Sequence, residues 1–143
     1  MPLDVDLAKN LASMIDAETF ILSKKTIFTF DRLGDDERVS ELTVRLSIDS
    51  LERDRTDRGR WQHKAIIQLV ILAPQQIRDE AKLINHLDFL DGVLGFVEQA
   101  APDGRIAMGF ESLQDERFDF DKYQNDGQFR SGVLVQYNLI SGK

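Results

Sequence analysis

The chain contains no cysteine among its 143 residues. This absence excludes disulfide bonds, thiolate metal sites and cysteine nucleophiles. Histidine is almost as scarce, because His63 and His86 are the two copies in the chain. Two isolated histidines are too few for a histidine-rich metal site, and we expect each to be an ordinary surface or packed side chain.

Long apolar runs are also missing. The longest, Ala65–Ala73, is interrupted by Gln68 and is much shorter than the ~18 residues that a membrane-spanning helix needs. The chain starts with Met1-Pro2-Leu3-Asp4, which lacks the basic residues that begin a signal peptide. We therefore expect a protein without membrane segments that is cytosolic when it is made.

The sequence carries no catalytic signature. Gly92-Val93-Leu94-Gly95 lies within a helical pattern and lacks the Lys-Ser/Thr that follows a phosphate-binding loop, and there is no Gly-x-Ser-x-Gly elbow. Glu80-Ala81-Lys82 resembles the end of a nuclease motif, but it falls on a predicted helix, where an exposed ion pair is the better interpretation. We expect no enzymatic activity, no cofactor and no metal.

A net charge of -7 argues against nonspecific binding to the outside of DNA, which needs a basic surface. Hydrophobic residues make up 42% of the chain, which is close to the globular norm. At this length and composition, residues 1–143 are expected to form a single domain with its own core.

An acidic cluster is the best candidate for a metal site, since carboxylates bind hard cations. A calcium loop that begins at Asp119 would need Asp or Asn at position 123 and Gly at 124, where the chain has Tyr123 and Gln124. A solvated acidic loop is therefore the favoured interpretation. The cluster consists of Asp115, Glu116, Asp119 and Asp121.

The apolar periodicity predicts an α+β fold, with a mainly antiparallel sheet of about five strands and two helices packed on it. The expected order along the chain is α-β-β-β-α-β-β. Helices are expected at Asp4–Ala17 and 77–99, and strands at Thr26–Phe30, Glu41–Asp49, Trp61–Ala73, Arg105–Leu113 and Phe129–Ile140.

Ala65–Ala73 is apolar at nearly every position, whereas a half-exposed strand would alternate. A strand of this kind is expected in the centre of a sheet, with both faces covered. A helix would cover one face, and a neighbouring subunit is a candidate for the other. We also expect Gly92 and Gly95 to permit close packing of the second helix against the sheet.

Ser50–Arg60 is a run of mixed charges, which we interpret as a long exposed loop between two strands. The simplest explanation is a solvated hairpin tip. The alternative is a flexible arm that binds a partner through paired charges, with Trp61 as a possible anchor. The candidate interface residues are Arg53, Arg55, Arg58, Arg60 and Trp61.

The C-terminal third resembles the tail terminator proteins of long-tailed bacteriophages. The resemblance rests on Phe118-Asp119-Phe120-Asp121, then Gly127-Gln128-Phe129-Arg130-Ser131, then Val133-Leu134-Val135-Gln136-Tyr137. The order of the other elements is compatible with that family, so the pattern spans nearly the whole chain. It is a pattern of order and spacing with few diagnostic residues.

The resemblance implies a structural virion protein without catalytic residues. Such a protein forms a ring, typically a homohexamer, that caps the tail tube and joins it to the head or neck. Its partners would be the tail tube protein and neck or connector proteins, and DNA would pass through without specific binding. The cluster at 115–121 would face the channel. Alternatives are another neck or head-closure component, or a small non-viral α+β module that binds a ligand or peptide.

Overall fold

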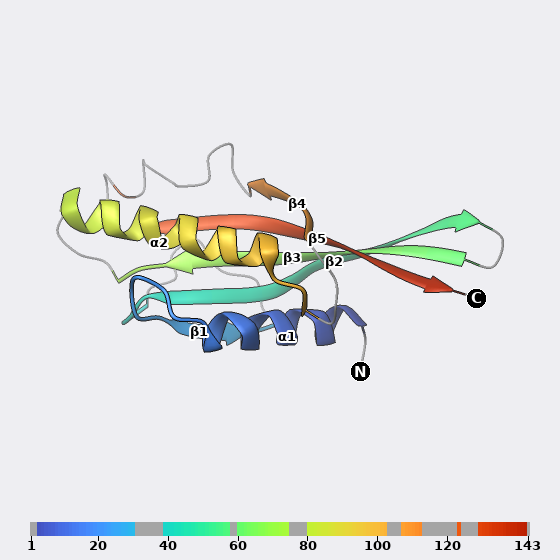
Figure 1. The fold of residues 1–143 in the computed structure, drawn as a ribbon, viewed down its shortest axis with the longest axis horizontal. Helices are drawn as coiled ribbons and strands as arrows, with labels where there is room; N and C mark the ends of the chain where they lie inside the picture. The colour runs from blue at the N-terminus through green and yellow to red at the C-terminus, as the bar shows by residue number, and fades with distance from the viewer. Residues whose placement is uncertain are drawn as a thin grey trace.

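The computed structural model describes residues 3–30, 39–57, 60–74, 80–102, 107–112, 123 and 129–142, with backbone alone for residues 3–4, 50–57, 60–63, 108–112 and 138–142. Two helices and five strands make up the described part (Figure 1). In chain order they are α1 (Leu3–Ala17), β1 (Lys25–Phe28), β2 (Thr43–Asp57), β3 (Arg60–Leu72), α2 (Glu80–Gln99), β4 (Ala107–Ser112) and β5 (Arg130–Gly142).

The strands form one mixed sheet in the order β1-β2-β3-β5-β4. Three of the neighbouring pairs are antiparallel, and β1 pairs with β2 in parallel. The α+β class and the two helices are thus confirmed, and β3 is the central strand, as its continuous apolar run predicts. The parallel pair was not expected, and it means that no tight hairpin can join β1 to β2.

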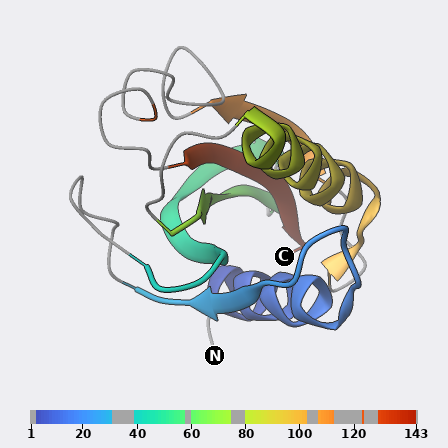
Figure 2. The same ribbon diagram turned by 90° about the vertical axis from the view of Figure 1, so that its left-hand side faces the viewer.

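Both helices pack on one face of the sheet, which contains the main core. Seen from the end of the molecule, the sheet is strongly curved, and α1 and α2 lie along the same side of it (Figure 2). Alternate residues of the three longest strands supply this face, since strand side chains alternate between faces. These residues include Val44, Leu46, Ala65, Ile67, Leu69, Ile71, Val133, Val135 and Tyr137, all buried.

Helix α1 is amphipathic, and Leu7, Leu11 and Ile15 are spaced four apart, so they share the face that is turned to the sheet. The helix ends at Ala17, and Lys24 supplies the missing hydrogen bonds at that end. Its Nζ donates to the carbonyl oxygens of Asp16 at 3.3 Å and Glu18 at 2.9 Å. A cation beside the last carbonyls of a helix also interacts favourably with the helix dipole.

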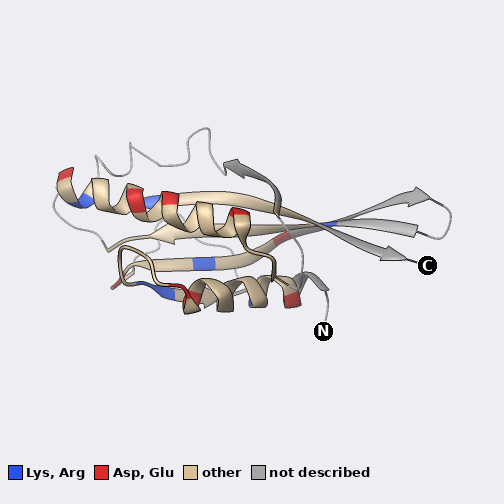
Figure 3. Cartoon of the chain, viewed as in Figure 1, with Lys and Arg blue, Asp and Glu red and all other residues tan. Residues whose placement is uncertain are grey.

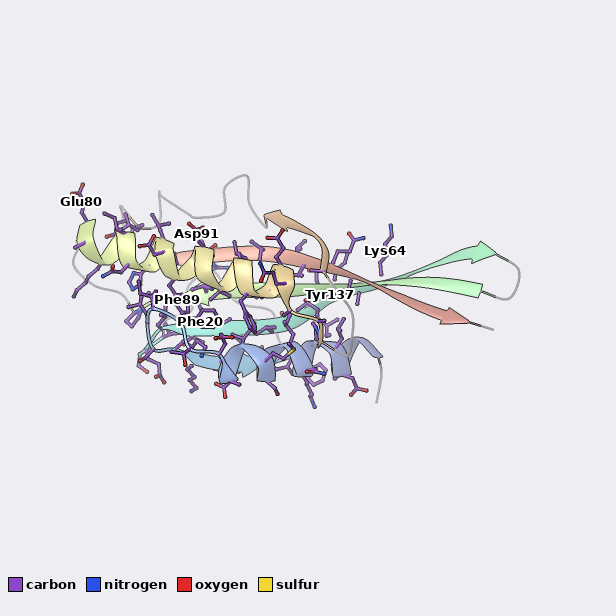
Figure 4. The ribbon with its side chains drawn as sticks, in the orientation of Figure 1. Phe20, Lys64, Glu80, Phe89, Asp91 and Tyr137 are labelled. Atoms are coloured by element: carbon purple, nitrogen blue, oxygen red, sulfur yellow. The ribbon has the colours of Figure 1, made fainter. Side chains whose placement is uncertain are left out.

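Phe20 joins the end of α1 to α2. Its ring meets those of Phe89 and Phe96 edge to face, with 5.7 Å between centroids in each pair (Figure 4). Phe89 is fully buried, and edge-to-face pairs of this kind add about 0.5–1.5 kcal/mol beyond the burial of their surface. Phe20 therefore fixes where the chain leaves α1.

The two glycines of α2 do not pack against the sheet, so that expectation was wrong. Both lie on the exposed side of the helix. A Cβ atom added at Gly95 would meet nothing within 4 Å, and one added at Gly92 would make an ordinary contact of 3.8 Å with Cδ1 of Phe20. Neither position therefore needs a glycine for space.

We expect Gly95→Ala to raise the free energy of unfolding by about 1 kcal/mol, because glycine in a helix interior is that much less favourable than alanine. Urea denaturation followed by circular dichroism measures the change. Gly92→Ala should give a similar gain, since its new methyl group has room beside Phe20. A loss of stability at Gly95 would show that the helix is packed against something at this position.

Candidate assembly surface

The sheet extends well beyond both helices at one end (Figure 1). This extension, which we call the arm, consists of residues 51–57 of β2, 60–64 of β3 and 138–142 of β5. The backbone strands of the arm are paired, with Glu52 opposite Lys64 on β3 and Lys64 opposite Asn138 on β5. The arm is therefore a three-stranded ribbon that neither helix covers.

The interpretation of Ser50–Arg60 as a loop was wrong. Residues up to Asp57 continue β2, and β3 already starts at Arg60, which is opposite Asp57. The register shifts twice along the pair, between Ile48 and Ser50 and between Arg55 and Asp57. Mixed charge was taken to indicate a loop, but the backbone of this segment is a strand up to Asp57.

Four of the five predicted interface residues lie in the arm. Arg53 and Arg55 are on β2, Arg60 and Trp61 begin β3, and Arg58 lies outside the described residues. The register brings backbone positions together that are distant in sequence, since Arg55 is directly opposite Trp61. The four residues of the predicted interface that the structure describes therefore lie on paired strands.

The face of the sheet opposite the helices is buried near one end of β3 and more open along the strand. Val70 and Leu72 are buried, whereas Ile66 and Gln68 are partly exposed. Ser47 Oγ donates to Oε1 of Gln68 at 3.1 Å across the β2–β3 pair. Both faces of β3 therefore carry apolar side chains, as predicted, and a neighbouring subunit as cover for this face stays a prediction.

Three hollows lined by described residues are small. One of about 220 Å³ lies beside Lys25, Ile27, Glu41 and Arg45, and two others measure about 290 and 280 Å³. Pockets that bind small molecules usually occupy about 300–1,000 Å³ and are largely apolar. These hollows give little support to a small-molecule site.

Several acidic residues lie along α2 (Figure 3). Glu80, Asp88, Asp91 and Glu98 are all exposed, and Lys82 is the one basic residue of this helix. The acidic cluster predicted to line a channel (Asp115, Glu116, Asp119 and Asp121) lies outside the described residues. No group of acidic and histidine residues in the described ranges could hold a metal ion, and no described helix is long and apolar enough to cross a membrane.

Two titratable side chains among the described residues each have a buried polar atom without a hydrogen-bond partner, the hydroxyl of Tyr137 and Nδ1 of the half-buried His86. Burial raises the pKa of Tyr137 above its usual value of 10, and its hydroxyl lies in the core near the base of the arm (Figure 4). Burial, and then the positive charge of Lys82, lower the pKa of His86 below 6.5. The His86 ring lies 5.2 Å from that of Phe129, and its Nδ1 is unpaired.

We expect His86 to make the fold less stable in acid. Because its pKa is lower in the folded state, the unfolded chain binds the proton more readily, so stability falls as pH drops below about 6.5 and is level above it. Urea denaturation between pH 7.5 and 5 should therefore show a smaller loss for His86→Gln than for the unaltered chain. His63→Gln is the control, and an equal effect of the two variants would contradict the assignment to His86.

Comparison with known proteins finds no family model and no curated protein that matches this chain.

Proposed function

We propose that this chain is a structural protein that assembles into a closed ring, with the role of a bacteriophage tail terminator. In this role the ring caps the finished tail tube in the virion and presents a surface to the neck, after assembly in the host cytoplasm. The observation that carries the proposal is the arm, because a ribbon that extends past its own helices offers surface that the subunit itself does not cover.

Four further features support a role in assembly. The central strand carries apolar side chains on both faces. The hollows are smaller than usual ligand sites. The sequence pattern of residues 118–137 resembles that of tail terminators, and the net charge of -7 suits a channel that lets DNA pass without holding it. Another neck or head-closure protein would share these features and differ in its partner.

The salt dependence of assembly tests the proposal. Subunits of net charge -7 repel one another, and salt screens this repulsion over about 8–10 Å near physiological ionic strength. We expect repulsion to outweigh the attraction between opposite charges in the arm, so moderate salt should favour the ring. Sedimentation velocity across a salt series measures this. A monomer at every salt concentration would contradict the proposed function. Rings that dissociate as salt rises would show that attraction between opposite charges outweighs the repulsion between subunits.

A further inference from the structure

The arm has two strand edges that no described strand pairs with. On one side, β1 pairs with β2 only from Thr43 to Leu46, although β2 continues to Asp57. On the other side, β4 pairs with β5 only from Val133 to Tyr137, although β5 continues to Gly142. Long open edges are templates for pairing with another chain, and proteins usually protect them.

The register shows which backbone groups point out of these edges. Residues along an antiparallel pair alternately bond to the partner strand and point away from it. The N–H of Thr29 donates to the carbonyl of Leu46 at 2.9 Å. The backbone N–H and C=O of Leu46, which is opposite Leu69, therefore point away from β3. Every β2 residue opposite an odd-numbered residue of β3 has its backbone groups turned outward in the same way. In the arm these residues include Arg53 and Arg55, which are opposite His63 and Trp61.

The same argument applies to β5. The N–H of Ala73 donates to the carbonyl of Phe129 at 3.1 Å, so the backbone groups of the odd-numbered β3 residues bond to β5. The β5 residues opposite even-numbered β3 residues then have their backbone N–H and C=O groups turned outward. In the arm these residues include Asn138 and Ile140, which are opposite Lys64 and Gln62. Each edge of the arm thus presents a row of backbone donors and acceptors.

We propose that the β5 edge of one arm pairs with the β2 edge of the arm of a second copy of this chain. The two edges lie on opposite sides of the same ribbon and at the same height, since Asp54 and Ile140 are both opposite Gln62. Such a contact is head to tail, and repetition of it closes a ring when the rotation fits. The inference rests on the proposed ring and names the surface that builds it.

The strand directions fix the geometry of this contact. Both β2 and β5 are antiparallel to β3, so they are parallel to each other. Subunits that stand side by side in the same orientation therefore join β5 to β2 as a parallel pair. A two-fold dimer would instead pair β2 with β2, or β5 with β5, in antiparallel fashion. Pairing through neighbours would also support a three-stranded ribbon that has no helix on it.

Cysteine cross-linking distinguishes these arrangements, and the absence of native cysteine makes each introduced thiol unique. Asp54→Cys and Ile140→Cys are made singly and together in the full chain, with tags of different length on the single variants. Within one subunit the two positions are separated by β3, roughly 9–10 Å apart, which is too far for a disulfide. Every cross-link between positions 54 and 140 therefore joins two subunits.

Under mild oxidation we expect neither single variant to cross-link alone and their mixture to give dimers that carry both tags. The double variant should give a ladder that stops at the ring. Dimers from either single variant would show two-fold pairing and overturn the proposal. Sedimentation could instead show rings while no cross-link forms, either between positions 54 and 140 or between the neighbouring positions 52 and 138. This result would overturn the edge contact and leave the proposed function standing. A ladder without an end would show edge pairing in an open filament, and would contradict the ring.

A proline substitution tests whether the backbone makes the contact. Arg53→Pro removes one outward N–H and no bond to β3, and edge strands tolerate proline at such positions. We expect it to raise the concentration needed for assembly about tenfold. Arg53→Ala, which keeps the N–H and removes the charge, should raise it less than about threefold. Equal effects of the two variants would show that the side chain makes the contact and would overturn the proposal.

Discussion

Removing the arm is expected to leave a folded monomer that no longer assembles. In the variant, an Asn-Gly turn replaces residues 53–63 and joins Glu52 to Lys64, which are opposite each other in the register and belong to the set that bonds across the pair, and the chain ends after Asn138. Asn-Gly is the preferred sequence for a two-residue hairpin turn. The buried residues of the helix-covered face all remain, so circular dichroism should be close to that of the full chain.

The matched control keeps the arm and removes three of its positive charges. At moderate salt, which screens the added repulsion between subunits, Arg53→Ala, Arg55→Ala and Arg60→Ala together should leave assembly largely intact, because the contact is made by backbone groups. Light scattering coupled to size exclusion gives the mass of both variants. Rings formed by the truncated chain would refute the role of the arm. Unfolding of the truncated chain would show that the ribbon is part of the folding unit.

Phe89→Ala is expected to lower the free energy of unfolding by about 3–5 kcal/mol, the usual range for a buried phenylalanine. Phe89 is fully buried on α2, and its ring also meets that of Phe20. The substitution leaves a cavity and removes this aromatic pair. Urea denaturation of the truncated monomer is the suitable measurement, because assembly would otherwise add to the apparent stability.

Ile84→Ala on the same helix is the control for Phe89→Ala. Ile84 is 57% exposed, so its truncation should change the free energy of unfolding by no more than about 0.5 kcal/mol. A large effect at Ile84 in the full chain, but not in the truncated monomer, would place this side chain in a subunit contact. Equal effects at both positions would contradict the assignment of Phe89 to the core.

The sequence predicts the helices and the central strand well because burial leaves a strong pattern there. Leu7, Leu11 and Ile15 repeat every four residues, and Ala65–Ala73 is apolar without interruption except at Gln68. The strand β1 was predicted, but its parallel direction relative to β2 was missed, because its four residues carry no signal for strand direction. The glycines of α2 were misplaced, because periodicity does not show which side of a helix meets the sheet at each turn.

The strand structure of the arm was missed for a different reason. Its charges were taken as evidence for a loop, yet no glycine or proline occurs between Thr43 and Asp57, and the next glycine along the chain is Gly59. Glycine and proline mark turns, so their absence up to Asp57 is the signal that could have extended the strand. Open strand edges cannot be found from sequence in this way, since they depend on the order of strands in the sheet.

Electron microscopy of the purified full chain at moderate salt is the most direct test of the central claim. The account predicts closed rings of uniform size with one rotational symmetry, and their absence from the truncated variant under the same conditions. Monomers or two-fold dimers at every protein concentration would contradict it, as would open filaments.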